Sequence, residues 1–151
     1  MTLPSHLLLG VIIGTATGDP VTAIAVSVLV DVDHLYSYAK HGVLWKPKQF
    51  WKTITDKADP YGDQRGYLHN IIIAAGISAL TFLVSPVFGI TFTTAYFGHL
   101  LLDALDTSDY FIFYPSKIIN LRGFIDYYSK QEILFDVVLV AILLMQFLLL
   151  M

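Results

Sequence analysis

The stretch GHLLLDALD (residues 98–106) places one histidine and two aspartates inside a long apolar run. At helical spacing, His99, Asp103 and Asp106 share one face, because residues three and four positions apart are neighbours on a helix. Ionisable side chains are costly within a membrane, so they usually face the bundle interior and mark a function. This face therefore predicts a metal site. The alternative is a polar helix seam whose groups satisfy one another.

The composition extends the membrane interpretation to the whole chain. Of 151 residues, 56% are hydrophobic and 14% are charged, which departs strongly from an average soluble domain. A chain of this length predicts one membrane-embedded domain, residues 1–151. The absence of cysteine excludes thiol catalysis, thiolate zinc sites and disulfides. The basic residues form no dense run, so no nucleic-acid partner is expected. The apolar N-terminus lacks the basic start of a signal peptide and is treated as part of the fold.

Apolar segments set the predicted fold. A helix needs ~20 residues to cross the hydrocarbon, with a range of ~17–25. The second, fourth and fifth apolar segments meet this length, the third is marginal and the first is short. Asp19-Pro20 and Ser85-Pro86 are helix-start signals, because Asp and Ser cap helices and Pro fits the first turn. We predict an all-α, multi-pass membrane helix bundle with about five membrane helices. Their approximate ranges are 4–17, 20–38, 67–84, 86–106 and the C-terminal helix 133–151.

Two predicted helical hairpins bring polar residues to one depth. Two of these residues lie at similar sequence distances on either side of the turn at Asp19, and two flank the turn at Ser85. Because helices rise ~1.5 Å per residue, each pair returns to a similar level. We therefore expect a shared site on one side of the membrane, rather than scattered cap and interface residues. The four residues are His6, Asp31, His69 and His99.

The basic residues predict which side this is. All of them lie in the loops 39–66 and 107–132. The positive-inside rule then places both loops, the N-terminus and the site in the cytoplasm, with the C-terminus outside. The same loops are rich in Trp and Tyr, which suit headgroup depth. Residues 47–57 are predicted to form a short interfacial helix that covers the mouth of the site, with Phe50, Trp51 and Ile54 facing the membrane. A solvated connector is the alternative.

Two further motifs add candidate residues. In VDVDH (residues 30–34), Asp31 and His34 share a helix face, whereas Asp33 points about 200° away from Asp31. Asp31 is the preferred ligand and Asp33 the second choice, against the alternative of a polar helix end. In QRGYLHN (residues 64–70), Arg65 would face the same way as His69 if the helix starts early enough. A guanidinium binds phosphate or carboxylate through two nitrogens, although Arg65 could instead snorkel to the interface.

These residues predict a divalent metal centre. Histidine and carboxylate ligands suit zinc, our first choice, or manganese or magnesium. Their number exceeds what one four-coordinate ion needs, so one or two ions are expected. Such a centre activates water for hydrolysis. Asp33 or Asp106 would move the proton of the water, and Arg65 would neutralise the charge of an ester. The predicted metal ligands are His6, Asp31, His34, His69, His99 and Asp103.

The ordered motifs resemble a known family. The chain is similar, over about residues 3–116, to the YdjM-like family of predicted membrane-bound metal-dependent hydrolases, which occurs in prokaryotic membranes. The resemblance implies a small multi-pass bundle and carries the family's polar motifs to the residues named above. The chain departs from the usual pattern at Val30, Gln64 and Asn70, where the family usually has Pro, His and Ser. The matching motifs are Ser5-His6, Asp31-Val32-Asp33-His34, Arg65-Gly66-Tyr67-Leu68-His69, Gly98-His99-Leu100-Leu101-Leu102-Asp103 and Tyr114-Pro115.

The sequence thus predicts a membrane-embedded metal-dependent hydrolase that acts at the cytoplasmic face on a phospholipid or another amphiphilic phosphoester. Membrane lipid would be both its solvent and its substrate. One alternative is a metal-ion or proton transporter that uses the same histidines and acids. Another is a non-enzymatic membrane subunit whose metal only staples helices. The sequence does not define the oligomeric state.

Overall fold

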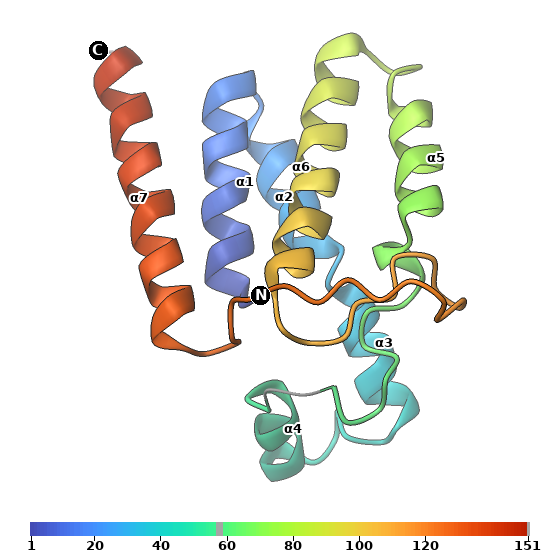
Figure 1. Ribbon diagram of the computed structural model, residues 1–151. Coiled ribbons are helices and arrows are strands. Elements are labelled where there is room, and N and C mark those ends of the chain that lie inside the picture. The colour runs from blue at the N-terminus through green and yellow to red at the C-terminus, as the bar shows by residue number, and fades with distance from the viewer. Residues whose placement is uncertain (57–58, 151) are drawn as a thin grey trace.

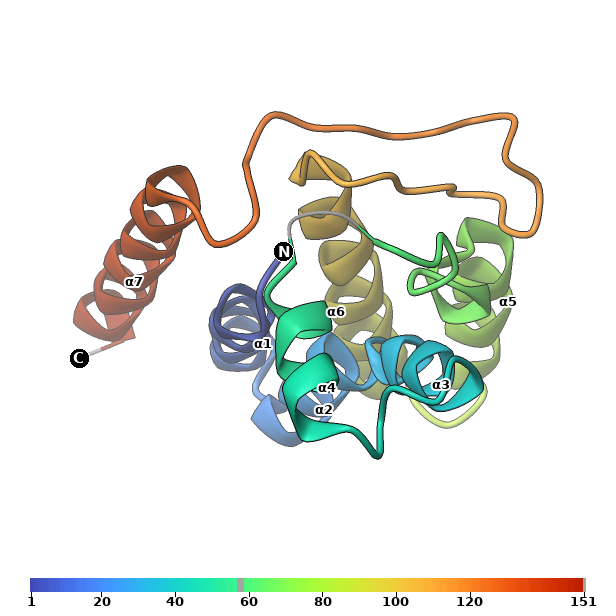
Figure 2. The ribbon, with the colours of Figure 1, turned by 90° about the horizontal axis from the view of Figure 1, so that it is seen from below.

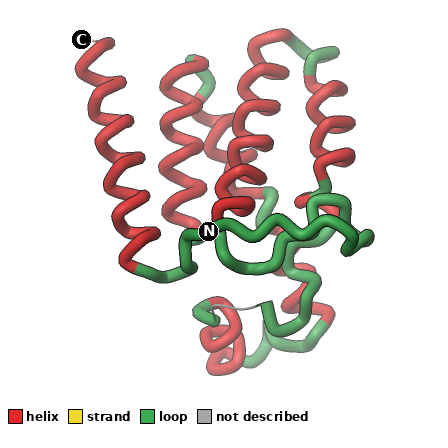
Figure 3. Tube along the Cα trace, in the orientation of Figure 1, coloured by secondary structure: helices red, strands yellow, loops and turns green. Residues whose placement is uncertain are grey.

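In a computed structural model that describes residues 1–56 and 59–150, the chain folds into helices joined by loops (Figures 1 and 3). The all-α prediction is confirmed. Over the described residues, the sheet-like pairings are two isolated bridges, between Asp106 and Ile125 and between Phe111 and Asn120. The helices are α1 (Leu3–Thr17), α2 (Pro20–Leu29), α3 (Val32–Lys40), α4 (Pro47–Ile54), the 3-10 helix η1 (Tyr67–His69), α5 (Ile71–Thr81), α6 (Pro86–Leu105) and α7 (Lys130–Leu150).

Helices α1, α2, α5, α6 and α7 run up and down beside one another (Figure 1). Helix α1 packs against α2, α6 and α7, and α6 packs against α2 and α5. The starts of α1 and α7 and the end of α6 lie at the same end of the bundle, which we call the site end. Helices α3 and α4 lie beyond the site end, and Figure 2 looks onto this end with α4 in the foreground. The bundle therefore carries an additional helical layer at one end.

Two helical stretches are long and apolar enough to cross a membrane, Pro20–Lys40 and Lys130–Leu150, whereas α1 and α5 are apolar but shorter. Each of the five predicted segments contains a helix, but five membrane spans are not confirmed. The predicted second segment is divided, because the chain bends at Val30 and Asp31 between α2 and α3. Helix α7 buries only Glu132 and Leu139 among its described side chains, so most of its apolar surface faces outward.

Side-chain caps fix where several helices begin. The Asp19 carboxylate accepts from the Thr22 amide, and the Ser85 hydroxyl accepts from the Phe88 amide, which confirms both predicted start signals. The third helix begins later than predicted, because Asn70 caps α5 at the Ile72 amide. Helix α7 begins earlier than predicted, because Ser129 Oγ accepts from the Glu132 amide. Met151 and Lys57, the predicted ends of two helices, lie outside the described residues.

Two glycines bring the backbones of α1 and α2 together. A Cβ atom on Gly10 would lie 2.9 Å from Ile24 Cα, and one on Gly14 would lie 2.4 Å from Pro20 Cα. Small residues four positions apart commonly allow such close approach between membrane helices. This contact holds α1, which carries His6, against α2.

We expect Gly14→Ala to lower the free energy of unfolding by about 1–3 kcal/mol, because the added methyl group meets the Pro20 backbone and forces the helices apart. Gly76→Ala on α5 is the matched control, since nothing lies within 4 Å of its Cβ position. The control should gain up to about 1 kcal/mol from helix propensity. Thermal unfolding in detergent measures both changes. Shifts of the same sign would contradict the close packing of α1 on α2.

Candidate metal centre

Histidines and aspartates from separate segments meet at the site end. Four of them, His6, His69, His99 and Asp103, have side chains that are at most 1% exposed. They converge because α1, η1 and α6 all reach this level of the bundle, as the two-hairpin argument predicted. The convergent residues are His6 of α1, Asp31 between α2 and α3, His34 of α3, His69 of η1, and His99 and Asp103 of α6.

The potential ligand atoms form two groups that could each hold a metal ion. The first ligand group is His6, Asp31, His99 and Asp103, and the second is Asp31, His34 and His69. Within each group the ligand atoms lie within 4.8 Å of one another. Asp31 belongs to both groups, which makes them adjacent.

The Asp31 carboxylate lies among three imidazoles. Its Oδ1 atom is 3.4 Å from His99 Nε2, 3.6 Å from His34 Nε2 and 3.7 Å from His69 Nε2. On the far side of the cluster, Asp103 Oδ2 lies 3.0 Å from His69 Nε2, and Asp103 Oδ1 lies 3.4 Å from His6 Nε2. The arrangement allows Asp31 to bridge two ions.

Unsatisfied polar atoms show that the cluster fits a cation. Buried polar atoms nearly always have a hydrogen-bond partner, and buried charges are paired or bind metals. Among the described residues, Asp103 and Asp106 pair with Arg65 and the Met1 amino group, whereas the ion-pair partners of Asp31 and Asp33 are histidines. Buried atoms without a hydrogen-bond partner are both ring nitrogens of His6, Asp31 Oδ1, His34 Nε2 and Asp103 Oδ2.

Two of the imidazole rings are oriented by a partner of the nitrogen that faces away from the ligand groups. His99 Nδ1 lies 2.7 Å from the Ser27 carbonyl oxygen, and His69 Nδ1 lies 3.3 Å from Asp33 Oδ2. Metal-binding histidines typically donate their second ring nitrogen to a carbonyl or a carboxylate in this way, which fixes the tautomer. The Nε2 atoms of both rings are left directed toward Asp31 and Asp103.

Asp33 lies behind His69 rather than within either ligand group. Its Oδ2 atom accepts from the Leu68 amide at 2.6 Å as well as facing the His69 ring. A Cβ on Gly66 would lie 3.3 Å from Asp33 Cγ, so the glycine permits this close approach. Asp31 and Asp33 face different nitrogens of the same His69 ring, Nε2 and Nδ1 respectively. The position of Asp33 suits orientation of His69 better than the predicted proton transfer or direct ligation.

Arg65 is not on a helix with His69. The condition for a shared helix face, an early helix start, is not met, because Gly66 separates Arg65 from η1, which begins at Tyr67. The Arg65 side chain instead reaches the end of α6, with Nε 3.2 Å from Asp103 Oδ2 and Nη2 3.2 Å from Asp106 Oδ2. Burial lowers the pKa of Arg65, but the two carboxylates outweigh it and raise the pKa above its ordinary value.

Asp106 also departs from its expected place. The prediction aligned it with His99 and Asp103, but the backbone becomes extended at Asp106, immediately after α6. Its Oδ1 atom accepts from the Ser108 amide at 2.7 Å, and it belongs to neither ligand group. Burial raises the pKa of Asp106, but the Met1 amino group and Arg65 outweigh it and bring the pKa below its ordinary value.

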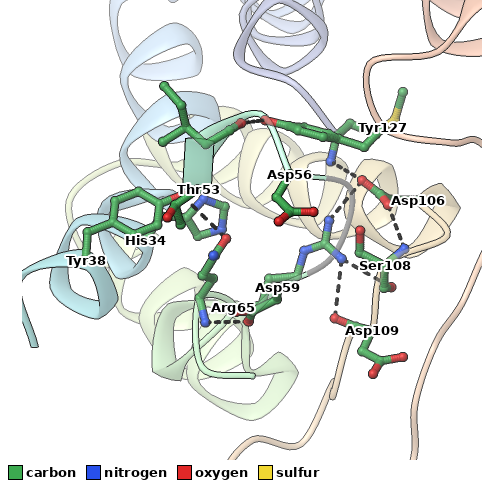
Figure 4. A pocket seen from close by; sticks show the side chains of 13 residues that line it. His34, Tyr38, Thr53, Asp56, Asp59, Arg65, Asp106, Ser108, Asp109 and Tyr127 are labelled. Carbon is green, nitrogen blue, oxygen red and sulfur yellow. Dashed lines mark hydrogen bonds and ion pairs between the residues drawn. The ribbon is translucent and has the colours of Figure 1, made fainter. Parts of the chain in front are cut away.

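A polar pocket opens beside the cluster (Figure 4). His34, Arg65 and Asp106 line it from the cluster side, and Thr53 and Ile54 of α4 line it from the other side. The Tyr127 hydroxyl donates to the Ile54 carbonyl at 3.0 Å, which ties α4 to the loop before α7. We name this cavity the head pocket. The prediction that a short helix covers the mouth of the site is consistent with the position of α4.

Only part of the predicted membrane-facing surface of α4 is exposed. Phe50 packs edge-on against Tyr38 with ring centroids 5.5 Å apart, so it faces the protein rather than the membrane. Trp51 is 66% exposed.

The loop before Arg65 is anchored to α3. Asp63 accepts hydrogen bonds from the Ser37 hydroxyl and, at 2.6 Å, from Lys40 Nζ, and it lies 3.1 Å from His41 Nε2. Burial raises the pKa of Asp63, but these three partners outweigh it and lower the pKa below its ordinary value. Asp63 is therefore charged at neutral pH and holds the loop that delivers Arg65. His41 serves this contact, away from both ligand groups.

Three residues that support the site, Tyr110, Glu132 and Asp136, were not predicted as site residues. Tyr110 is fully buried, and its hydroxyl donates to the His69 carbonyl at 2.7 Å. Glu132 of α7 is 2% exposed and accepts from the Thr2 amide at 2.6 Å, next to the start of α1. Ser5 donates to Asp136 at 2.7 Å on the next turn of α7. The sequence does contain a signal for Glu132 and Asp136, since these two acids lie four positions apart at the start of an apolar helix.

The fold and the cluster together define an α-helical membrane protein with a candidate metal centre. The family model described as YdjM inner membrane protein matches residues 1–150, and the chain belongs to this family. The resemblance inferred from the motifs is thus confirmed, and it extends beyond residue 116 to α7. No curated protein and no solved structure matches the chain.

Proposed function

We propose that this protein is a membrane-embedded, metal-dependent hydrolase that acts on a phospholipid or another amphiphilic phosphoester. The observation that carries the proposal is the pair of adjacent ligand groups that share Asp31, next to Arg65 and the head pocket. Paired ligand groups of this kind are typical of centres that hydrolyse phosphoesters. The cluster lies at the end of an apolar bundle, where lipid headgroups would be within reach.

The donor set suggests the metal. Imidazoles combined with carboxylates suit zinc, and manganese or magnesium are further possibilities. When bound, a divalent ion would supply Lewis acidity, polarising a phosphoryl oxygen and making a water more acidic. His6, His99 and Asp103 would hold one ion, His34 and His69 a second, and Asp31 both.

The remaining polar side chains have separate tasks in this proposal. Arg65 lines the head pocket beside Asp103 and would place its positive charge near the phosphate. Asp106 also lines the head pocket and is ionised, so it could accept the proton of an attacking water and return it to the leaving alcohol. Asp33 would act only through His69 by fixing its ring.

We further propose that the site end faces the cytoplasm. The segments that carry the described basic residues lie at or beyond this end; they are α3, α4 with its N-cap, the residues before η1, and the loop from α6 into α7. The positive-inside rule assigns such segments to the cytoplasmic side. The lipid in question would then come from the inner leaflet. A transporter has less support, because the acids and histidines of α1 and α6, which are His6, His99 and Asp103, all belong to the candidate site, and α2 carries neither acid nor histidine.

A direct assay tests the enzyme. The protein, purified in detergent and stripped of metal, is assayed with zinc, manganese or magnesium on dioleoyl phosphatidylethanolamine and on soluble bis(para-nitrophenyl) phosphate. We expect turnover only with added metal, and its loss in His99→Ala but not in the control Asp126→Asn, because Asp126 is exposed and contacts Thr107 outside the cluster. If no ester is hydrolysed with any of the three metals, the hydrolase proposal is wrong. Ion flux into liposomes that depends on His99 would support a transporter instead.

A further inference from the structure

We infer that an apolar groove between α2, α5 and α6 binds one acyl chain of the phospholipid whose phosphate lies at the metal centre. This inference rests on the proposed function and assigns a second part of the substrate to the structure. The groove has a volume of about 160 Å³. Its lining includes Leu29, Val30, Leu68, Ile77, Phe92 and Tyr96.

The groove follows from how three helices pack. Helix α6 lies between α2 and α5 and packs against both, whereas α2 and α5 contact each other far less (Figure 1). The two outer helices therefore leave a furrow over the middle of α6, with Phe92 and Tyr96 as its floor. Leu29, which is 58% exposed, stands at its edge.

The groove offers only apolar contact. The single polar atom among its lining side chains is the Tyr96 hydroxyl, which donates to the Leu68 carbonyl at 2.7 Å and is thus already used. A peptide or a polar ligand would bury unsatisfied groups here. A helix of a second protein, about 10 Å across, is too wide for a groove of this volume. A methylene chain fits the volume and the apolar lining of the groove.

The groove lies next to the metal centre. Val30 precedes Asp31, Leu68 precedes His69, and Tyr96 lies one helical turn before His99. The head pocket adjoins the same cluster from the other side, where Arg65 and Asp106 line it (Figure 4). Apolar groove, cation site and polar pocket thus follow one another in the order of the tail, phosphate and headgroup of a phospholipid. The positive charge of Arg65 and of any bound ion complements the phosphate between them.

Filling the groove tests this inference. Ile77→Trp places a large side chain in it, and Leu29→Trp narrows it from α2. Leu80→Trp is the matched control, because Leu80 is also on α5 but is 64% exposed and lies outside the groove. The first readout is native mass spectrometry of metal-free protein after exchange in dioleoyl phosphatidylethanolamine and detergent. The second is kcat/KM for that lipid and for soluble bis(para-nitrophenyl) phosphate.

We expect the wild type and Leu80→Trp to retain one lipid, and both groove variants to retain it at least about tenfold less. Their kcat/KM should fall by a similar factor for the lipid and stay within about twofold for the soluble ester. Equal lipid retention in all four proteins would overturn the inference, whatever the activities. If the wild type hydrolyses neither ester, the proposed function fails, whereas the retention measurement still decides whether the groove binds an acyl chain.

Discussion

Asp31→Asn is expected to lose both metal ions and to lower kcat by at least about 1,000-fold, the largest effect on activity that we predict. Asp31 belongs to both ligand groups, with Oδ1 facing His99 of the first and His34 and His69 of the second, so its neutralisation weakens both positions together. The amide has nearly the shape of the carboxylate, so the fold should be retained. Elemental analysis of the purified variant and a phosphoester assay at saturating zinc measure the two losses.

Substitutions of two other aspartates serve as controls, one with an intermediate expected effect on metal binding and one with no expected effect. Asp33→Asn should weaken metal affinity by about 10- to 100-fold but retain ions at saturating metal, because Asp33 acts through the His69 ring. Asp126→Asn should change neither quantity, since Asp126 is exposed and contacts Thr107 outside the cluster. A full metal complement in Asp31→Asn would show that Asp31 does not bridge the groups.

Arg65→Gln is expected to destabilise the metal-free protein by about 3–5 kcal/mol, the largest effect on stability that we predict. The substitution leaves the carboxylates of Asp103 and Asp106, both 1% exposed, without the guanidinium that now lies 3.2 Å from each. Zinc should restore part of the loss, because a cation bound by Asp103 compensates one of the charges. The double variant Arg65→Gln/Asp106→Asn should also recover stability, since it removes the other charge.

Chemical unfolding in detergent, with and without zinc, measures these differences. Arg122→Gln is the matched control, because Arg122 forms an exposed pair with Asp109, with side chains 64% and 52% exposed. Such a surface pair contributes less than about 1 kcal/mol. Equal losses in Arg65→Gln and Arg122→Gln, or no effect of zinc on the former, would contradict the buried charge network.

The helices and the cluster could be predicted from the sequence because their signals are local. Apolar runs, the Asp19 and Ser85 caps and helical spacing define most of α1, α2, α6 and α7 without knowledge of the tertiary fold. Because the rise per residue of a helix is constant, the sequence distances also predicted that His6 and His99 lie at the same level of the bundle. Their rings are stacked in the structure, with centroids 3.8 Å apart.

The remaining features depend on contacts between distant residues, which periodicity does not encode. The bend at Asp31 is one example, because it lies within a run that reads as a continuous helix. The direction of the Arg65 side chain is a second example. It points toward Asp106 at the end of α6 rather than along η1, because its partners lie in a distant part of the chain. Glu132 was overlooked because its partner, Thr2, is at the other end of the chain.

The central claim is that separate segments surround a cation with imidazoles and carboxylates, and anomalous diffraction at the zinc edge tests it most directly. In crystals of the zinc-loaded protein, we predict an anomalous peak at about 2.0–2.2 Å from ligand atoms of His6, Asp31, His99 and Asp103. A second peak should lie on the other side of Asp31, beside His34 and His69. Zinc peaks confined to the protein surface, with none inside the cluster, would contradict the account.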